Sequence, residues 1–262
     1  MINRAHVIGM GRLGRHWADR LSALNVTVHR WSRTAQDGVR SMSEWSQVEP
    51  ADAVFIAVPD DAIASVAESI LPHLPGSTAL VHHAGSVPLE ALPVEPERRA
   101  VMWPPMTFTA GSAPDWDTLP LGIEAADPQW MQLGLRMAPQ AFALTATSRP
   151  ALHLGAVLAG NLTAAWLGVV ESYLKEHGLP LSALAPLVEE SVKKALEGGA
   201  LDTVSGPASR NDADTLQRQA AALNCLSHPD QDLTLIHTLL TNRILAQHGH
   251  PPPPLQGETE GH

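Results

Sequence analysis

Hydrophobic positions in the first 60 residues predict buried strands on either side of a helix. Residues 5–8 form a short apolar run, residues 26–30 alternate between apolar and polar, and residues 53–58 are continuously apolar. Runs of these kinds predict strands, the last of them buried on both faces. A helix is expected at residues 11–24, because apolar side chains recur at spacings of four, four and three at Leu13, Trp17, Leu21 and Leu24. Strands and helices in this order indicate an α/β fold with a doubly wound parallel sheet.

This pattern continues to about residue 145 and then changes. A helix is expected at residues 61–71, and further strands at 79–83, 100–103, 121–125 and 141–145. After a linker at residues 147–150, helical periodicity alone remains, at residues 152–177, 181–196, 212–223 and 230–247.

Three parts of the chain follow from this change. We expect an α/β domain over residues 1–149 and an all-helical domain over residues 150–248. The remaining residues, 249–262, are Pro-rich and polar, and we expect them to form a disordered tail.

Composition narrows the partners and the compartment. The chain has 17 basic and 27 acidic residues and a net charge of -10, which repels both nucleic acid and an anionic membrane surface. Its single cysteine, Cys225, cannot form an intramolecular disulfide, and the N-terminus carries no secretion signal, so a cytoplasmic protein is expected. Residues 151–170 have the length of a membrane span and no charged side chain. Because they are rich in Ala and Gly and include polar residues, we expect instead a helix buried in a protein core.

A glycine-rich run follows the first predicted strand and opens the first predicted helix. It has the form G-x-G-x-x-G and comprises Gly9, Met10, Gly11, Arg12, Leu13 and Gly14. In a βαβ unit such glycines allow a tight turn, close approach to a pyrophosphate and close packing of helix on strand. The N-terminus of the helix then offers free N–H groups to the phosphates. A glycine-rich turn without a ligand is the alternative.

The end of the second predicted strand distinguishes between two dinucleotides. An NAD site usually has an acidic residue there, whereas this chain has Ser32, Arg33 and Thr34. Hydroxyl groups and a planar guanidinium suit a 2'-phosphate, so NADP(H) is expected as the cofactor. Residues 1–40 also hold seven arginines against two aspartates. The loop after the third strand, with Val58, Pro59 and Asp60, is expected to line the nicotinamide side.

These motifs, with residues 81–85, 153–161 and 205–212, resemble a known family. It comprises two-domain Rossmann-like NADP-binding proteins whose helical C-terminal half is a domain of unknown function. The family is similar to pyrroline-5-carboxylate reductases, 6-phosphogluconate dehydrogenase-like enzymes and deazaflavin-dependent NADP reductases. The resemblance implies a Rossmann domain, an all-α 6-phosphogluconate dehydrogenase-like C-terminal domain that mediates dimerisation, and an active-site cleft between them.

Two positions depart from the pattern. The family commonly has a His-Pro pair where this chain has Trp103 and Pro104. Related β-hydroxyacid dehydrogenases carry a catalytic lysine four residues before an asparagine that matches Asn161, and here that position is Val157. Lysine-based chemistry therefore cannot be transferred to this chain.

Three residues are candidates for catalysis. In the resembling family the first helix of the second domain borders the nicotinamide, and here it carries His153 and Asn161. Eight residues of ideal helix separate them by about 12 Å of rise and about 80° of rotation. We expect His153 to donate a proton and Asn161 to anchor substrate or nicotinamide, although both could be buried polar residues of the helix packing.

His82 and His83 end a predicted strand, and strand alternation lets only one of them face the cleft. We expect this to be His82. A metal site is not expected, because no Cys or His elsewhere has ligand spacing.

A loop between two helices offers a site for a substrate carboxylate. In pyrroline-5-carboxylate reductases a loop at the corresponding place binds such a group, which here implicates Ser205 and Arg210. The alternative is a turn followed by an N-cap at Asn211 or Asp212.

Two main functions remain open. The first is an NADP(H)-dependent oxidoreductase that reduces a small oxo acid or a cyclic imine. The second is a non-catalytic NADP(H)-binding regulatory or scaffold protein, which the missing lysine and histidine keep open. Deazaflavin-dependent reduction of NADP is a third possible function. The long apolar central helix further predicts a homodimer through the helical domain.

Overall fold

The computed structural model describes residues 2–108, 113–224 and 231–251. They fall into two compact units, Met1–Leu162 and Thr163–His262. Cys225 and most of the predicted tail, residues 252–262, lie outside the described residues.

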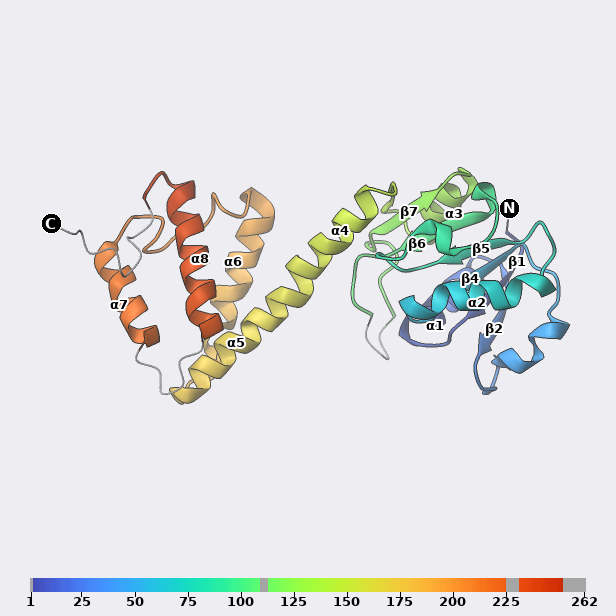
Figure 1. Ribbon diagram of the computed structural model, residues 1–262, viewed down its shortest axis with the longest axis horizontal. Coiled ribbons are helices and arrows are strands. Elements are labelled where there is room, and N and C mark those ends of the chain that lie inside the picture. The colour runs from blue at the N-terminus through green and yellow to red at the C-terminus, as the bar shows by residue number, and fades with distance from the viewer. Residues whose placement is uncertain (1, 109–112, 225–230, 252–262) are drawn as a thin grey trace. The chain divides into compact units, whose positions relative to one another are not determined.

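The first unit is built on a sheet that has eight strands in its described part, in the order β3-β2-β1-β4-β5-β6-β7-β8 (Figure 1). Its strands are β1 (Arg4–Ile8), β2 (Thr27–Ser32), β3 (Arg40–Ser41), β4 (Ala53–Ile56), β5 (Ala79–His82), β6 (Arg99–Trp103), β7 (Leu121–Ala125) and β8 (Ala141–Ala143). The pairs are parallel except β6 with β7, which are antiparallel. The strand order reverses between β1 and β4, and ligands of open α/β sheets bind at such a switch point.

Helices cover both faces of this sheet. They are α1 (Arg12–Ala23), α2 (Ile63–Ile70) and α3 (Gln129–Met137), with a 3₁₀ segment η1 (Met42–Gln47). On one face the buried Trp17 of α1 and Trp130 of α3 pack against the inward side chains of β1, β4, β5 and β6. On the other face α2 packs with Trp31 and Trp45. Alternate residues of the central strands thus enter two separate cores, as strands buried on both faces require.

Helical structure begins before the end of the first unit. α4 (Ser148–Ala156) continues through a π-helical segment η6 (Val157–Asn161) into α5 (Leu162–Glu176). The second unit also contains α6 (Ala185–Gly198), α7 (Ala213–Asn224) and α8 (Gln231–Gln247). The fold class expected from the sequence is therefore confirmed, an α/β sheet followed by helices.

Several local expectations are wrong. The predicted linker at residues 147–150 is largely the first turn of α4, because Ser148 and Thr145 exchange hydrogen bonds that start a helix there. The sheet is not parallel throughout, and α3 and β3 were not expected.

The apolar helix at residues 151–170 is not buried in a core, contrary to expectation. Within the described residues, Ser148–Glu176 forms a helix that is long and apolar enough to cross a membrane, judged by length and composition alone. No part of its most apolar stretch is buried. Leu154 is 58% exposed and Leu158 is 54% exposed. Both side chains lie near the end of the first unit, whose described residues do not cover them.

Candidate functional site

The three glycines of the glycine-rich run are needed for different physical reasons. Gly9 has a φ of +97°, and a Cβ there would lie 2.3 Å from the Ala57 carbonyl oxygen. A Cβ on Gly14 would lie 1.8 Å from the Gly9 carbonyl oxygen. A Cβ on Gly11 would meet nothing within 4 Å. Packing therefore requires Gly9 and Gly14, whereas Gly11 faces open space, as a glycine does where a ligand approaches the backbone.

The start of α1 is open to an anion. Gly11 is its N-cap, with no side-chain hydrogen bond and no acidic residue in the first turn. The positive end of the helix dipole and its free N–H groups are then available to a phosphate. Arg12 is exposed, Met10 is buried, and Leu13 is partly buried against the core. Arg15 fixes the loop by donating from Nε to the Met10 carbonyl at 2.9 Å, a role not expected from the sequence.

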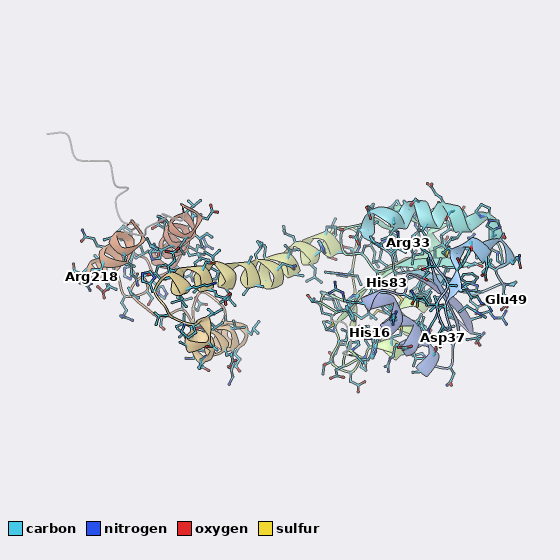
Figure 2. The ribbon with its side chains drawn as sticks, turned by 90° about the horizontal axis from the view of Figure 1, so that it is seen from below. His16, Arg33, Asp37, Glu49, His83 and Arg218 are labelled. Atoms are coloured by element: carbon cyan, nitrogen blue, oxygen red, sulfur yellow. The ribbon has the colours of Figure 1, made fainter. Side chains whose placement is uncertain are left out.

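Residues 32–34 follow the neighbouring strand. The Ser32 hydroxyl donates to the Thr34 carbonyl, which forms a tight turn. Arg33 and Thr34 are exposed, and Figure 2 shows Arg33 in the first unit. Ser41 on β3 donates from Oγ to the Arg33 carbonyl at 3.3 Å. The exposed guanidinium and hydroxyl groups of this turn could hold a phosphate.

The loop after β4 lies on the other side of the switch point. Val58 is half-buried, whereas Pro59 and Asp60 are exposed. Asp60 accepts a hydrogen bond at 2.8 Å from the hydroxyl of Ser86, which follows β5. Since β1, β4 and β5 are parallel neighbours, their three following loops share one edge of the sheet.

His82 and His83 point to opposite faces of the sheet. The His83 ring stacks on Trp17 at 4.4 Å between centroids, and its Nδ1 donates to the Met102 carbonyl at 2.8 Å. Burial lowers the pKa of His83 to about 3. His82 is completely buried, and its Nδ1 accepts from the backbone N–H of Ala84 at 3.2 Å.

His82 is held neutral by its surroundings. Burial, aided by the charge of Arg149, lowers its pKa to about 4. Its Nε2 has no hydrogen-bond partner within the described residues. The Pro88 carbonyl favours the protonated ring and so offsets part of the lowering of the pKa. A buried, neutral imidazole at the end of β5 can donate a hydrogen bond but does not exchange protons with solvent near pH 7.

His153 lies against the loop after β5. Its ring centroid is 5.6 Å from that of Trp103. A Cβ on Gly85 would lie 2.5 Å from His153 Cδ2 and 2.7 Å from Trp103 Cε2, so only glycine fits between the two rings. Because the His153 side chain is only partly buried, it is the more accessible of the two candidate histidines.

A buried ion pair lies beside this histidine. Arg149 is 2% exposed, and its Nε donates to Glu124 Oε2 at 2.6 Å. Its Nη1 donates to the Gly85 carbonyl at 2.8 Å. Sequence reasoning missed this pair, because its members come from β7 and from the segment expected to be a linker.

Asn161 is exposed at the end of the π-helical segment. The rise and rotation expected between His153 and Asn161 assumed an ideal α-helix, so those values do not apply across residues 157–161. π-helical segments inside α-helices occur frequently at functional sites.

Ser205 and Arg210 belong to the second unit, and both are exposed. Asp212 accepts from the Thr215 N–H at 3.1 Å, which caps α7, and this bond helps to lower the pKa of Asp212. The turn and N-cap are therefore present, and a carboxylate-binding role for Ser205 and Arg210 stays a prediction.

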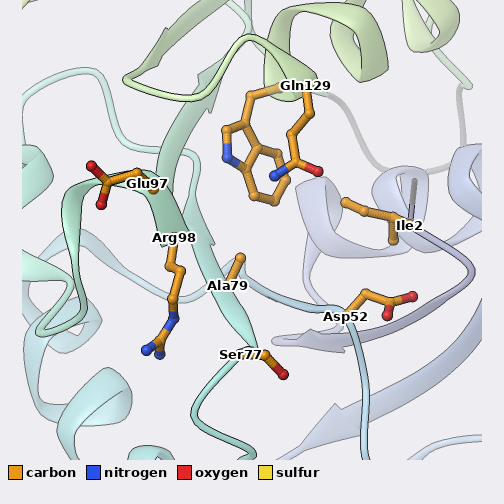
Figure 3. Close-up of a pocket in the computed structure, with 8 residues that line it drawn as sticks. Ile2, Asp52, Ser77, Ala79, Glu97, Arg98 and Gln129 are labelled. Atoms are coloured by element: carbon orange, nitrogen blue, oxygen red, sulfur yellow. The ribbon is translucent and has the colours of Figure 1, made fainter.

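Metal ligation and a separate cavity are the two other kinds of site that the structure bears on. The described residues contain no group of three or more His, Cys, Asp or Glu side chains that could hold a metal ion. A cavity lies beside Asp52, Ser77, Ala79 and Arg98 (Figure 3). These residues are at the amino ends of β4, β5 and β6, at the opposite edge of the sheet from the glycine loop, so this cavity is not part of the candidate site.

Comparisons with known proteins agree with this fold. Residues 119–244 match the domain of unknown function DUF2520. The resemblance stated from the motifs is thereby confirmed for these residues. No curated protein sequence matches the chain.

Solved structures share the architecture. A proposed NADP oxidoreductase from Bacteroides fragilis is 22% identical with a TM-score of 0.75, over 93% of this chain and 98% of that one. Protein TM1727 from Thermotoga maritima is 20% identical with a TM-score of 0.73, over 94% and 100%. The pyrroline carboxylate reductase of Plasmodium falciparum, solved with NADP bound, is 12% identical with a TM-score of 0.56, over 94% and 98%. The chain thus has the fold of Rossmann-like oxidoreductases.

Proposed function

We propose that the protein is an NADP(H)-dependent oxidoreductase that reduces a small oxo acid or a cyclic imine. The observation that carries the proposal is the open space at Gly11, at the uncapped N-terminus of α1, beside two glycines that packing requires. A pyrophosphate fits the chemistry of this loop, because backbone N–H groups and a helix dipole are its usual partners. The exposed Arg33 and Thr34 on the neighbouring strand end favour a 2'-phosphate over a free ribose hydroxyl.

The remaining residues define what the chain can contribute to reduction. When bound, the nicotinamide supplies a hydride. His153 is the proposed proton donor, since its imidazole is partly accessible and lies at the carboxyl end of β5 and β6. His82 is the proposed hydrogen-bond donor that stays neutral. Asn161, and Ser205 with Arg210, are the proposed contacts for substrate, the last as a partner for a carboxylate.

Calorimetric titration with NADPH and, in parallel, NADH tests the cofactor proposal. We expect NADPH to bind more tightly, and Arg33→Ala to weaken NADPH by at least tenfold while changing NADH little. Arg218→Ala is the matched control, because Arg218 is an exposed arginine on α7 of the second unit (Figure 2). Equal affinity for both nucleotides would contradict the NADP assignment.

A non-catalytic NADP(H)-binding protein is the second candidate function. It is favoured by two substitutions: Val157 stands where related β-hydroxyacid dehydrogenases have a lysine, and Trp103 stands where the resembling family commonly has a histidine. An oxidoreductase should consume NADPH with an oxo acid or imine and lose turnover in His153→Gln without losing NADPH affinity. NADPH binding with no turnover on a broad panel of such substrates would favour the second function.

We also propose a homodimer formed through the helical unit. α8 leaves Leu235 and Leu239 57% and 59% exposed, one helical turn apart on the same face. A second copy can cover such a face with its own equivalent surface. Light scattering after size exclusion should give twice the chain mass of 28.0 kDa. A monomer at micromolar concentration, or solubility only in detergent, would contradict the dimer.

A further inference from the structure

The buried Arg149 has no role in the reaction proposed above, and stability does not explain it. It lies in the first turn of α4, where the helix dipole disfavours a cation. Its guanidinium is almost completely removed from water, and a buried ion pair is often no more stabilising than apolar residues of the same size. The function of this arginine is therefore expected to lie in the geometry that it imposes.

Arg149 connects three segments that are distant in the sequence. Nε donates to Glu124 of β7 at 2.6 Å, and Nη1 donates to the carbonyl oxygens of Gly85 at 2.8 Å and Ala84 at 3.4 Å. The rigid fork of a guanidinium can hold a carboxylate and a backbone loop at once. As a result, the loop after β5 is fixed to the start of α4.

His153 follows Arg149 by four residues on α4, so both side chains lie on one face of the helix. The arginine binds the Gly85 carbonyl, and the His153 ring lies where a Gly85 Cβ would stand. Trp103 approaches the same point from β6. Any shift of α4 relative to the loop would therefore move the imidazole away from the Trp103 ring.

We propose that Arg149 and Glu124 are positioning residues that hold His153 over Gly85 and against Trp103. The inference rests on the proposed function, in which His153 donates a proton. It does not make Arg149 a catalytic residue, because the guanidinium is covered by Glu124 and two carbonyl groups.

The decisive variant removes both charges, Arg149→Met with Glu124→Met. Methionines of similar length fill the space without leaving a buried charge unpaired, so thermal stability should stay within a few degrees of wild type. The position of His153 is measured by NMR of its imidazole protons, which are assigned by their loss in His153→Gln. In wild type the Trp103 ring should shift these signals, and in the double variant we expect that shift to be lost.

Arg149→Lys keeps the charge but not the fork, and it provides a second measurement if the double variant does not fold. The lysine cannot bind Glu124 and the Gly85 carbonyl together in the same plane. We again expect the His153 signals to move toward those of an exposed histidine. The matched control is Arg99→Met with Glu90→Met, an ion pair of 3.5 Å in the same unit with an exposed carboxylate. This control should leave the His153 signals unchanged.

Turnover and cofactor binding separate the inference from the function on which it rests. If the proposed function holds, the double variant should lose at least tenfold in kcat, with NADPH affinity unchanged within twofold. If NADPH does not bind to wild type, the proposed function fails, and the NMR shift still tests the positioning. A folded double variant, or a folded Arg149→Lys, with wild-type His153 signals would overturn the inference.

Discussion

The two units of the chain bury their apolar side chains to very different degrees. In the first unit Trp17, Phe55, Ile56 and Leu80 are fully buried between sheet and helices. In the described part of the second unit, the buried apolar side chains are Ala208, Leu223, Leu233 and Leu245. Seven large apolar side chains there are exposed, namely Leu179, Leu187, Val192, Leu196, Leu235, Leu239 and Leu240.

This difference shows which interactions each unit depends on. A sheet covered on both faces completes its core within one chain. Helices that expose this much apolar surface need something beyond the described part of their own unit to cover it. The first unit should therefore respond to core substitutions, to strain and to acid, and the second to changes in association.

The largest effect is expected from Trp17→Ala. Trp17 is fully buried and stacks on His83, and removing a buried tryptophan costs about 3–5 kcal/mol of unfolding free energy. Leu196→Ala is the contrasting variant, because Leu196 is 83% exposed and should change stability by less than about 0.5 kcal/mol. Urea denaturation followed by circular dichroism compares them. Equal losses would contradict the difference between the units.

Next in size is a pair of glycine substitutions within the glycine-rich run at the start of α1. Gly14→Ala places a methyl group against the Gly9 carbonyl and should cost at least about 1–3 kcal/mol, as overpacking does. Gly11→Ala meets no protein atom and should leave stability nearly unchanged. It should instead weaken NADPH by tenfold or more if the pyrophosphate lies there. Thermal melting measures the effect on stability, and calorimetry measures the effect on NADPH binding. Normal NADPH binding by Gly11→Ala would argue against a pyrophosphate at this position.

Acid should destabilise the sheet unit through its buried histidines. Burial lowers the pKa of His6 and of His82 to about 4, and of His83 to about 3. In the folded state these three histidines therefore stay neutral, whereas in the unfolded state they take up protons below about pH 6.5. Stability is present above that pH and is lost toward pH 3–4, by about 1.4 kcal/mol per pH unit for each histidine.

The substitution His83→Phe isolates one of these contributions. Phenylalanine can keep the stacking on Trp17 but cannot be protonated. Unfolding between pH 6 and pH 4 should therefore take up about one proton fewer, and the free energy of unfolding should fall less steeply with pH. Tryptophan fluorescence reports this unit, because six of the seven tryptophans precede residue 163. His73→Phe, at an exposed position, should leave the slope unchanged.

The strands and helices that the sequence predicted are those whose signal is local. α1 and the buried strands follow from spacing or from continuous apolar runs, and the glycine loop follows from its place between them. The antiparallel direction of β7 could not be predicted, because a strand buried in either direction has the same apolar pattern. α3 had a signal in Trp130, Leu133 and Met137, at spacings of three and four, that was too short to stand out.

The candidate site was harder to predict than the fold. Arg149 is held by Glu124, 25 residues away, and by Gly85, 64 residues away, so nothing next to it in the sequence indicates burial. The π-helical segment before Asn161 is likewise invisible to periodicity. Contacts over long sequence distances determine both features, and only folded coordinates bring these residues together.

The smallest effect on unfolding is expected from Leu239→Lys. This variant tests the difference between the two units by changing the association of two copies rather than the stability of one. Leu239 is exposed in the single chain, so the change should alter the unfolding free energy of the monomer by less than about 0.5 kcal/mol. If this face of α8 binds a second copy, a charge there would be buried without a partner and the dimer should dissociate. Light scattering should then show the mass fall from twice 28.0 kDa to 28.0 kDa. Leu135→Lys, at a position 47% exposed on α3 of the first unit, is the matched control and should stay dimeric. Dissociation caused by Leu135→Lys but not by Leu239→Lys would instead place the interface on the sheet unit.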